Sequence, residues 1–162
     1  MFAAHFAAGL ALKQRAPRAP LSAMILGAFV LDGVWIVLGT LRVDRTDYDD
    51  WSHSLVMSIV WATLFSSLFW KLGRRAVCVL WLAVFSHFLL DLIVQGASVS
   101  PPGLLSTPPL VATHDRLLQL VICIALLTVY TIDARRASIA WPRVLATSAI
   151  VMALNGRFLL GV

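Results

Sequence analysis

The fold class is decided by residues 76–94, which read AVCVLWLAVFSHFLLDLIV. A helix needs about 20 mostly apolar residues to cross the roughly 30 Å hydrocarbon core of a bilayer. This stretch has that length, and its only Asp, Glu, Lys, Arg or His side chains are His87 and Asp91. It therefore predicts a membrane-spanning helix that places two ionisable groups inside the membrane.

The rest of the chain is similarly apolar. Hydrophobic residues make up 60% of the 162 residues and charged residues 13%, whereas soluble domains contain about 45–50% and about 25%. Residues 2–12 form a short apolar segment, and the other stretches long enough to span a bilayer are 21–41, 54–72, 117–132 and 144–160. We therefore predict an all-α integral membrane protein, a single polytopic domain over residues 1–162 with about five transmembrane helices. The short N-terminal helix is expected either to cross the membrane or to re-enter it.

The 13 Lys and Arg residues lie mostly between these stretches, and their number alternates along the chain. Four of them lie in even-numbered loops or near the C-terminus. The other nine lie in the first, third and fifth loops: Lys13, Arg15, Arg18, Lys71, Arg74, Arg75, Arg135, Arg136 and Arg143. Cytoplasmic loops of membrane proteins carry the excess of Lys and Arg, so we expect the odd-numbered loops in the cytoplasm. The clustering predicts membrane lipids rather than nucleic acid as partners, despite the formal charge of +5. The oligomeric state stays open.

Five ionisable side chains lie near the end of the helices that this orientation makes extracytoplasmic. They are His5, Asp32, His53, His87 and Asp91. His87 and Asp91 are four residues apart and therefore share one helix face. An ionised carboxylate inside the membrane costs about 2.5–3.5 kcal/mol, and a divalent cation bound between carboxylates and neutral imidazoles offsets that cost. All five are candidate ligands of a divalent metal ion, zinc in the first place, and Asp32 and Asp91 are candidate catalytic groups.

Four short motifs carry a family resemblance: Ala4-His5 with Gly9, Leu31-Asp32, Trp51-Ser-His-Ser-Leu55 and Phe85-Ser-His-Phe-Leu-Leu-Asp-Leu92. In this order they resemble bacterial inner-membrane proteins grouped as membrane-bound, metal-dependent hydrolases, over about residues 1–102. Better-known members have a Pro-Asp-x-Asp-His run at the position of Asp32. The resemblance implies location in a bacterial inner membrane and metal-dependent hydrolysis by the histidines and aspartates of these motifs.

The residues themselves leave three classes of function open. A metal-dependent hydrolase with its site in the outer half of the bilayer would act on a lipid or a lipid-linked phosphate. Carboxylates and histidines inside membranes also build the proton or cation pathways of small transporters. The third class is an accessory protein whose polar side chains only hydrogen-bond between helices, or a haem carrier with His5 or His53 facing His87.

Two polar loops are expected at the same end as the candidate site. Residues 42–52 contain four aspartates that are expected to form a solvated face: Asp44, Asp47, Asp49 and Asp50. Residues 96–114 form the longest loop, and His114 with Asp115 is expected to be a solvated helix start.

Overall fold

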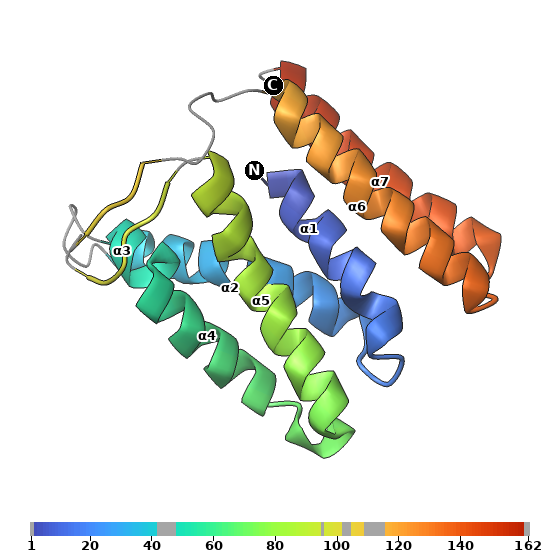
Figure 1. Cartoon of the computed structure of the whole chain (residues 1–162), viewed down its shortest axis with the longest axis horizontal. Coiled ribbons are helices and arrows are strands. Elements are labelled where there is room, and N and C mark those ends of the chain that lie inside the picture. The colour runs from blue at the N-terminus through green and yellow to red at the C-terminus, as the bar shows by residue number, and fades with distance from the viewer. Residues whose placement is uncertain (1, 42–47, 95, 102–104, 109–115, 161–162) are drawn as a thin grey trace.

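The computed structural model of the chain is a bundle of α-helices (Figure 1). It describes residues 2–41, 48–94, 96–101, 105–108 and 116–160, with side chains for 3–41, 49–94, 96–101, 105–108 and 117–153. The seven α-helices of this described part are α1 (Phe2–Leu12), α2 (Leu21–Thr40), α3 (Tyr48–His53), α4 (Leu55–Ser67), α5 (Arg74–Val94), α6 (Arg116–Arg136) and α7 (Trp141–Leu160). The 3₁₀ helices η1 (Lys13–Arg15) and η2 (Trp70–Leu72) follow α1 and α4. The described part contains no sheet, which confirms the all-α prediction for these residues.

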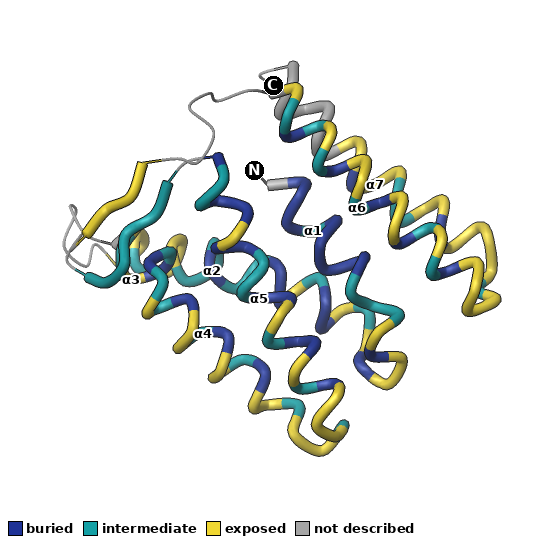
Figure 2. The backbone as a smooth tube through the Cα atoms, in the orientation of Figure 1, coloured by how far each residue is buried: buried dark blue, intermediate teal, exposed yellow. Residues whose placement is uncertain are grey.

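Helix α1 lies in the middle of the bundle, between the α2–α5 group and the α6–α7 hairpin (Figure 1). Its alanines and Leu10 are almost fully buried, and Figure 2 shows most of the helix in dark blue. Small side chains allow helix backbones to approach closely in membrane bundles. The approach is very close at Gly9, where a Cβ atom would lie 2.9 Å from the carbonyl oxygen of Met24 on α2. The short first helix is therefore part of the core of the bundle.

Within the described residues, three helices are long and apolar enough to cross a membrane: Leu21–Thr40, Arg74–Val94 and Leu117–Arg136. Many of their outward side chains are exposed leucines, isoleucines and valines. Lipid covers such a surface without the penalty that water would impose. Three of the predicted spans are thus supported, and their observed ends agree with the predicted ends to within a few residues.

The predicted span 54–72 is shorter than expected. Helix α4 has 13 residues, which correspond to a length of about 20 Å. Near its end the hydroxyl of Ser67 donates to the carbonyl oxygen of Leu64 at 2.8 Å, and Gly73 at φ +91° turns the chain into α5. The last predicted span, 144–160, lies within α7, whose side chains are described only as far as residue 153.

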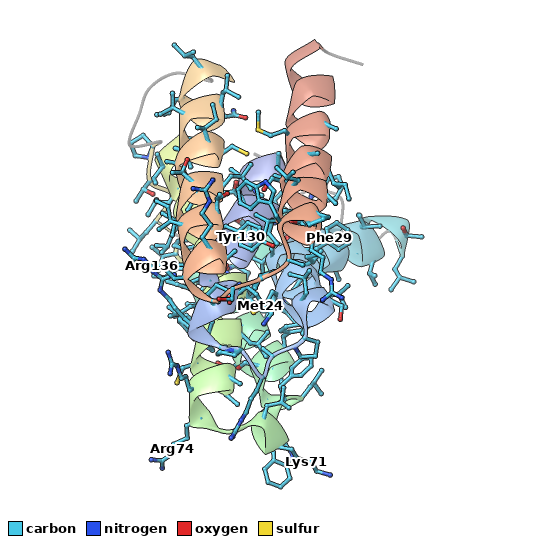
Figure 3. The ribbon with its side chains drawn as sticks, turned by 90° about the vertical axis from the view of Figure 1, so that its right-hand side faces the viewer. Met24, Phe29, Lys71, Arg74, Tyr130 and Arg136 are labelled. Atoms are coloured by element: carbon cyan, nitrogen blue, oxygen red, sulfur yellow. The ribbon has the colours of Figure 1, made fainter. Side chains whose placement is uncertain are left out.

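The loops that are rich in Lys and Arg meet at one end of the bundle. Figure 1 shows η1, η2 and the α6–α7 connection at this end, and Figure 3 labels Lys71 and Arg74 there. An ion pair of 3.1 Å joins Arg15 Nη1 to Asp133 Oδ2 of α6. Arg75 Nε donates to the carbonyl oxygen of Arg15 at 2.6 Å. The basic residues of the odd-numbered loops therefore lie at one end of the bundle, and α3 lies at the opposite end.

The end of the bundle that carries α3 is covered by residues 96–101. The first N–H groups of a helix have no partner within the helix. Here the N–H groups of Leu55 and Val56, at the start of α4, donate to the carbonyl oxygens of Ser98 and Val99, each at 3.0 Å. The predicted polar loop 42–52 thus contains helix α3, and the start of loop 96–114 is tied to α4. Four of the residues that are predicted to be solvated lie outside the described residues: Asp44, Asp47, His114 and Asp115.

Candidate metal centre

The five candidate residues line one cavity of about 530 Å³. They reach it from four helices: His5 from α1, Asp32 from α2, His53 from the end of α3, and both His87 and Asp91 from α5. His5, His87 and Asp91 are buried, with 3%, 1% and 8% of their surfaces exposed. The structure thus brings the five side chains together. Their roles as ligands or catalytic groups stay predictions.

Asp91 lies at the centre of the group because its carboxylate faces all three imidazoles. Its Oδ1 atom is 3.4 Å from Nε2 of His5, and its Oδ2 atom is 3.2 Å from Nε2 of His87. The Nε2 atom of His53 is 4.0 Å from the same Oδ2. Asp32 adds a second carboxylate, whose Oδ1 lies 3.5 Å from Nε2 of His53 and 3.6 Å from Nε2 of His87. Two acidic groups therefore share three histidines.

The orientation of the His87 ring is set by a backbone hydrogen bond. Its Nδ1 atom lies 2.8 Å from the carbonyl oxygen of Ala28 on α2. A carbonyl oxygen can only accept a hydrogen bond, so Nδ1 carries the proton and Nε2 of the neutral ring presents a lone pair. The ring of His5 stacks on that of His87, with centroids 3.6 Å apart and planes at 3°. Both rings are thus held in place by α1 and α2.

The His53 ring is oriented in the same way by Ser52. The Ser52 hydroxyl donates to the carbonyl oxygen of Asp49 at 3.1 Å, and its oxygen lies 2.6 Å from Nδ1 of His53. When the hydroxyl hydrogen is bonded to Asp49, the Ser52 oxygen accepts the proton of a neutral His53 that is protonated at Nδ1. The Nε2 atom of neutral His53 then also presents a lone pair to the carboxylates of Asp32 and Asp91. Ser52 itself is fully buried.

This arrangement points electron pairs of nitrogen at electron pairs of oxygen. Neutral His53 and His87 have no hydrogen on Nε2 to donate to the carboxylates that face them. A cation between these atoms removes the repulsion, either as protons on the imidazoles or as one metal ion. Two sets of ligand atoms could hold a metal ion, since the atoms in each set lie within 4.8 Å of one another: His5, His87 and Asp91, and Asp32, His53 and His87.

The geometry of these histidines leaves no room for a haem between them. In a haem carrier of this kind two imidazoles bind the iron from opposite sides of the macrocycle. The rings of His5 and His87 are instead stacked face to face at 3.6 Å. Those of His53 and His87 have centroids only 5.1 Å apart and planes at 60°, so no macrocycle fits between either pair.

Part of the cavity wall was not predicted from the sequence. Asp49 and Asp50 of α3, expected on a solvated face, line the cavity together with Trp35 of α2. The Trp35 indole N–H donates to Asp49, and the hydroxyl of Ser98 donates to Asp50. Asp49 is exposed as expected and Asp50 is half-buried, but the sequence did not predict that both line the cavity. A signal was present, because Asp50 precedes His53 by three residues and shares its face if this segment is helical.

We expect Ser52→Ala to weaken metal binding without unfolding the protein. The substitution removes the oxygen that holds Nδ1 of His53, so that the ring loses its fixed tautomer and orientation. Loss of such a supporting hydrogen bond lowers metal affinity about 10–100-fold. Titration of the metal-free protein with zinc measures the effect. Ser66→Ala serves as the matched control, because Ser66 is equally buried but bonds to the carbonyl oxygen of Thr63 in α4. Equal zinc affinities of Ser52→Ala and Ser66→Ala would show that Ser52 does not support a metal ligand.

Comparisons with protein-family models, with curated proteins and with solved structures each gave no match for this chain. The resemblance to membrane-bound, metal-dependent hydrolases therefore stays a prediction that depends on the motifs around the five candidate residues. The structure contains helices that could cross a membrane, and its groups of histidine and aspartate side chains could hold a metal ion.

Proposed function

We propose that the protein is a membrane-embedded, metal-dependent hydrolase that acts on a lipid or lipid-linked phosphate. The proposal is carried by one observation: the Nε2 atoms of three imidazoles face two carboxylates around one cavity. Asp32 and Asp91 among neutral imidazoles leave two negative charges, and one divalent cation neutralises these two carboxylates. That neutrality makes the site tolerable inside a membrane.

The spacing of the ligand atoms supports zinc as the ion. Nitrogen and oxygen ligands lie about 2.0–2.2 Å from zinc, so two ligands of a tetrahedral site are about 3.3–3.6 Å apart. Within the set His5, His53, His87 and Asp91, the carboxylate of Asp91 lies 3.4 Å from His5 and 3.2 Å from His87, which is close to this spacing, and 4.0 Å from His53. His5, His53, His87 and Asp91 would supply the ligands, which leaves the carboxylate of Asp32 for the reaction.

The position of the site supports action from the extracytoplasmic side of a bacterial inner membrane. The basic loops meet at one end of the bundle, and α3, which carries His53, lies at the other (Figure 1). If the basic end is cytoplasmic, as the distribution of Lys and Arg predicts, the cavity lies in the outer half of the bilayer. A lipid headgroup reaches that depth without leaving the membrane.

Asp32 suits the role of general base because its side chain is the more accessible carboxylate, 28% exposed against 11% for Asp91. It would take a proton from a water molecule whose oxygen forms the new bond to phosphorus. The bond between phosphorus and the ester oxygen breaks, and that oxygen leaves as an alcohol with the proton that Asp32 took from the water. A divalent cation supplies Lewis-acid polarisation of the phosphoryl oxygens when it is bound.

Metal content and phosphate release from phosphatidic acid, measured on the same detergent-purified protein, test the proposal. We expect the wild-type protein to hold zinc and to release phosphate. Asp32→Asn is expected to keep the metal and to lose activity about 100-fold or more, which is the usual contribution of a general base. Asp133→Asn is the control, since Asp133 pairs with Arg15 at the other end of the bundle. A metal-free wild-type protein, or a zinc-loaded one without activity, would contradict the proposal.

A further inference from the structure

A second, apolar cavity lies between α1, α2 and α7. It has a volume of about 160 Å³ and is lined by Phe6, Leu10, Ile25, Thr147, Ile150 and Val151. The one hydroxyl in this lining is engaged elsewhere, because Thr147 Oγ1 donates to the carbonyl oxygen of Arg143 at 2.9 Å. Apolar cavities of about 150 Å³ stay dry and bind small apolar molecules. This crevice thus has the size and the chemistry to hold a piece of hydrocarbon rather than water.

The crevice and the candidate metal centre are both lined by residues of α1 and α2. On α1, Leu10 follows His5 by five residues, which places the crevice about 8 Å from the histidine along the helix axis. On α2, Ile25 precedes Asp32 by seven residues, or about 10 Å, and these two residues share one helix face. Both helices displace the crevice from the cavity in the same direction, towards the basic end of the bundle.

Two phenylalanines connect the crevice with the metal centre. Phe6, which lines the crevice, follows His5 directly, and Phe29 lies between Ile25 and Asp32 on α2 (labelled in Figure 3). Their rings are stacked, with centroids 6.5 Å apart. The side chains of α1 and α2 between the centre and the crevice thus include two apolar rings.

The outer wall of the crevice faces the surroundings of the bundle. Ile150 of α7 is 62% exposed although it lines the crevice, whereas Leu10 at its inner wall is only 1% exposed. Where the helices cross a bilayer, the surrounding medium at this depth is the hydrocarbon of lipid chains. An acyl chain can thus enter from the side, and the polar cavity lies where its headgroup would be.

We infer that the crevice binds one acyl chain of a lipid substrate whose headgroup occupies the histidine–aspartate cavity. The inference rests on the proposed function and narrows its substrate class to molecules anchored in the bilayer. A molecule with a polar group in the cavity and hydrocarbon about 10 Å further towards the basic end of the bundle is amphipathic. Water-soluble phosphates lack the second contact.

Photo-crosslinking with a phosphatidic acid that carries a diazirine on one acyl chain tests this inference in vesicles of phosphatidylethanolamine and phosphatidylglycerol. Exposed side chains react with any neighbouring lipid, so the informative site is Leu10, which only a chain inside the crevice reaches. We expect label on Leu10 in the wild-type protein. Ile25→Trp fills the crevice and should lower that label about tenfold, because the larger side chain takes the space of the acyl chain.

Two variants separate filling of the crevice from damage to the fold. Leu26→Trp makes the same change at the neighbouring residue, which is 56% exposed and does not line the crevice, and should leave the label on Leu10 unchanged. Ile25→Ala widens the crevice and should retain the label. Absence of label on Leu10 in the wild-type protein, or full labelling of Ile25→Trp, would overturn the inference.

The same experiment distinguishes this inference from the proposed function. Zinc removal by a chelator should leave the label on Leu10 in place, because the crevice contains no metal ligand. Label on Leu10 without phosphate release would retain the acyl site and refute the hydrolase. Phosphate release without label on Leu10 would retain the hydrolase and refute the acyl site.

Discussion

Asp91→Asn is expected to lower the zinc affinity of the protein at least about 100-fold, beyond the usual effect of losing a supporting hydrogen bond. The reason is geometric, since the carboxylate of Asp91 approaches the Nε2 atoms of His5, His87 and His53 to 3.4, 3.2 and 4.0 Å. An amide keeps the shape of the side chain but loses the negative charge and one acceptor oxygen. Isothermal titration of the metal-free protein with zinc measures the loss.

The fold should tolerate this substitution. The amide can donate to an imidazole lone pair, so Asp91→Asn replaces the contact of the carboxylate with protonated imidazoles in the metal-free protein by a neutral hydrogen bond. We expect the midpoint of thermal unfolding of the metal-free variant to stay within a few degrees of that of the metal-free wild-type protein. Asp133→Asn, at the basic end, should leave the zinc affinity unchanged. If Asp91→Asn bound zinc as tightly as the wild-type protein, the proposed role of Asp91 in the metal centre would be wrong.

Gly9→Ala is expected to lower the free energy of unfolding by about 1–3 kcal/mol, the usual cost of overpacking. A Cβ atom at Gly9 would lie 2.9 Å from the carbonyl oxygen of Met24 and 3.4 Å from Cβ of Ala28. The first neighbour is backbone, so relief requires that α1 move away from α2. His5 lies one turn away on α1 and should move with it, which would also weaken zinc binding.

Unfolding in mixed micelles with increasing fractions of dodecyl sulfate measures this loss. Gly39→Ala is the matched control, because Gly39 lies on α2 and a Cβ atom there would meet no atom within 4 Å. At that position the methyl group should be neutral or slightly stabilising, since alanine is the better helix former. Equal stability of Gly9→Ala and Gly39→Ala would show that α1 and α2 are not in close contact.

Much of the candidate site could be predicted because hydropathy and helix periodicity are local properties of the chain. The spacing of His87 and Asp91 places both on one face of a helix wherever that helix packs. The depth of Asp32 follows from counting residues along an apolar run. Asp49 and Asp50 could not be placed in this way, since they lie outside the apolar runs and reach the cavity through the turn of chain that forms α3.

The length of α4 shows where a hydropathy pattern is insufficient. Leu68, Phe69 and Trp70 continue the apolar run, so the pattern predicts a longer helix than the one that ends at Ser67. The chain is nevertheless turned by η2 and Gly73, because backbone bonds and packing against α5 determine the end of the helix. Apolar composition alone does not distinguish a helix from an apolar turn.

By itself, the sequence determined the all-α class, the apolar stretches that could cross a membrane, the grouping of basic loops and the set of costly polar side chains, because each follows from the composition of short segments. Only the tertiary structure decided that α1 lies in the core, that Ala28 and Ser52 orient two imidazoles, and that an apolar crevice lies between α1, α2 and α7. These features depend on contacts between segments far apart in the chain. No periodicity within one helix specifies which neighbour it will meet.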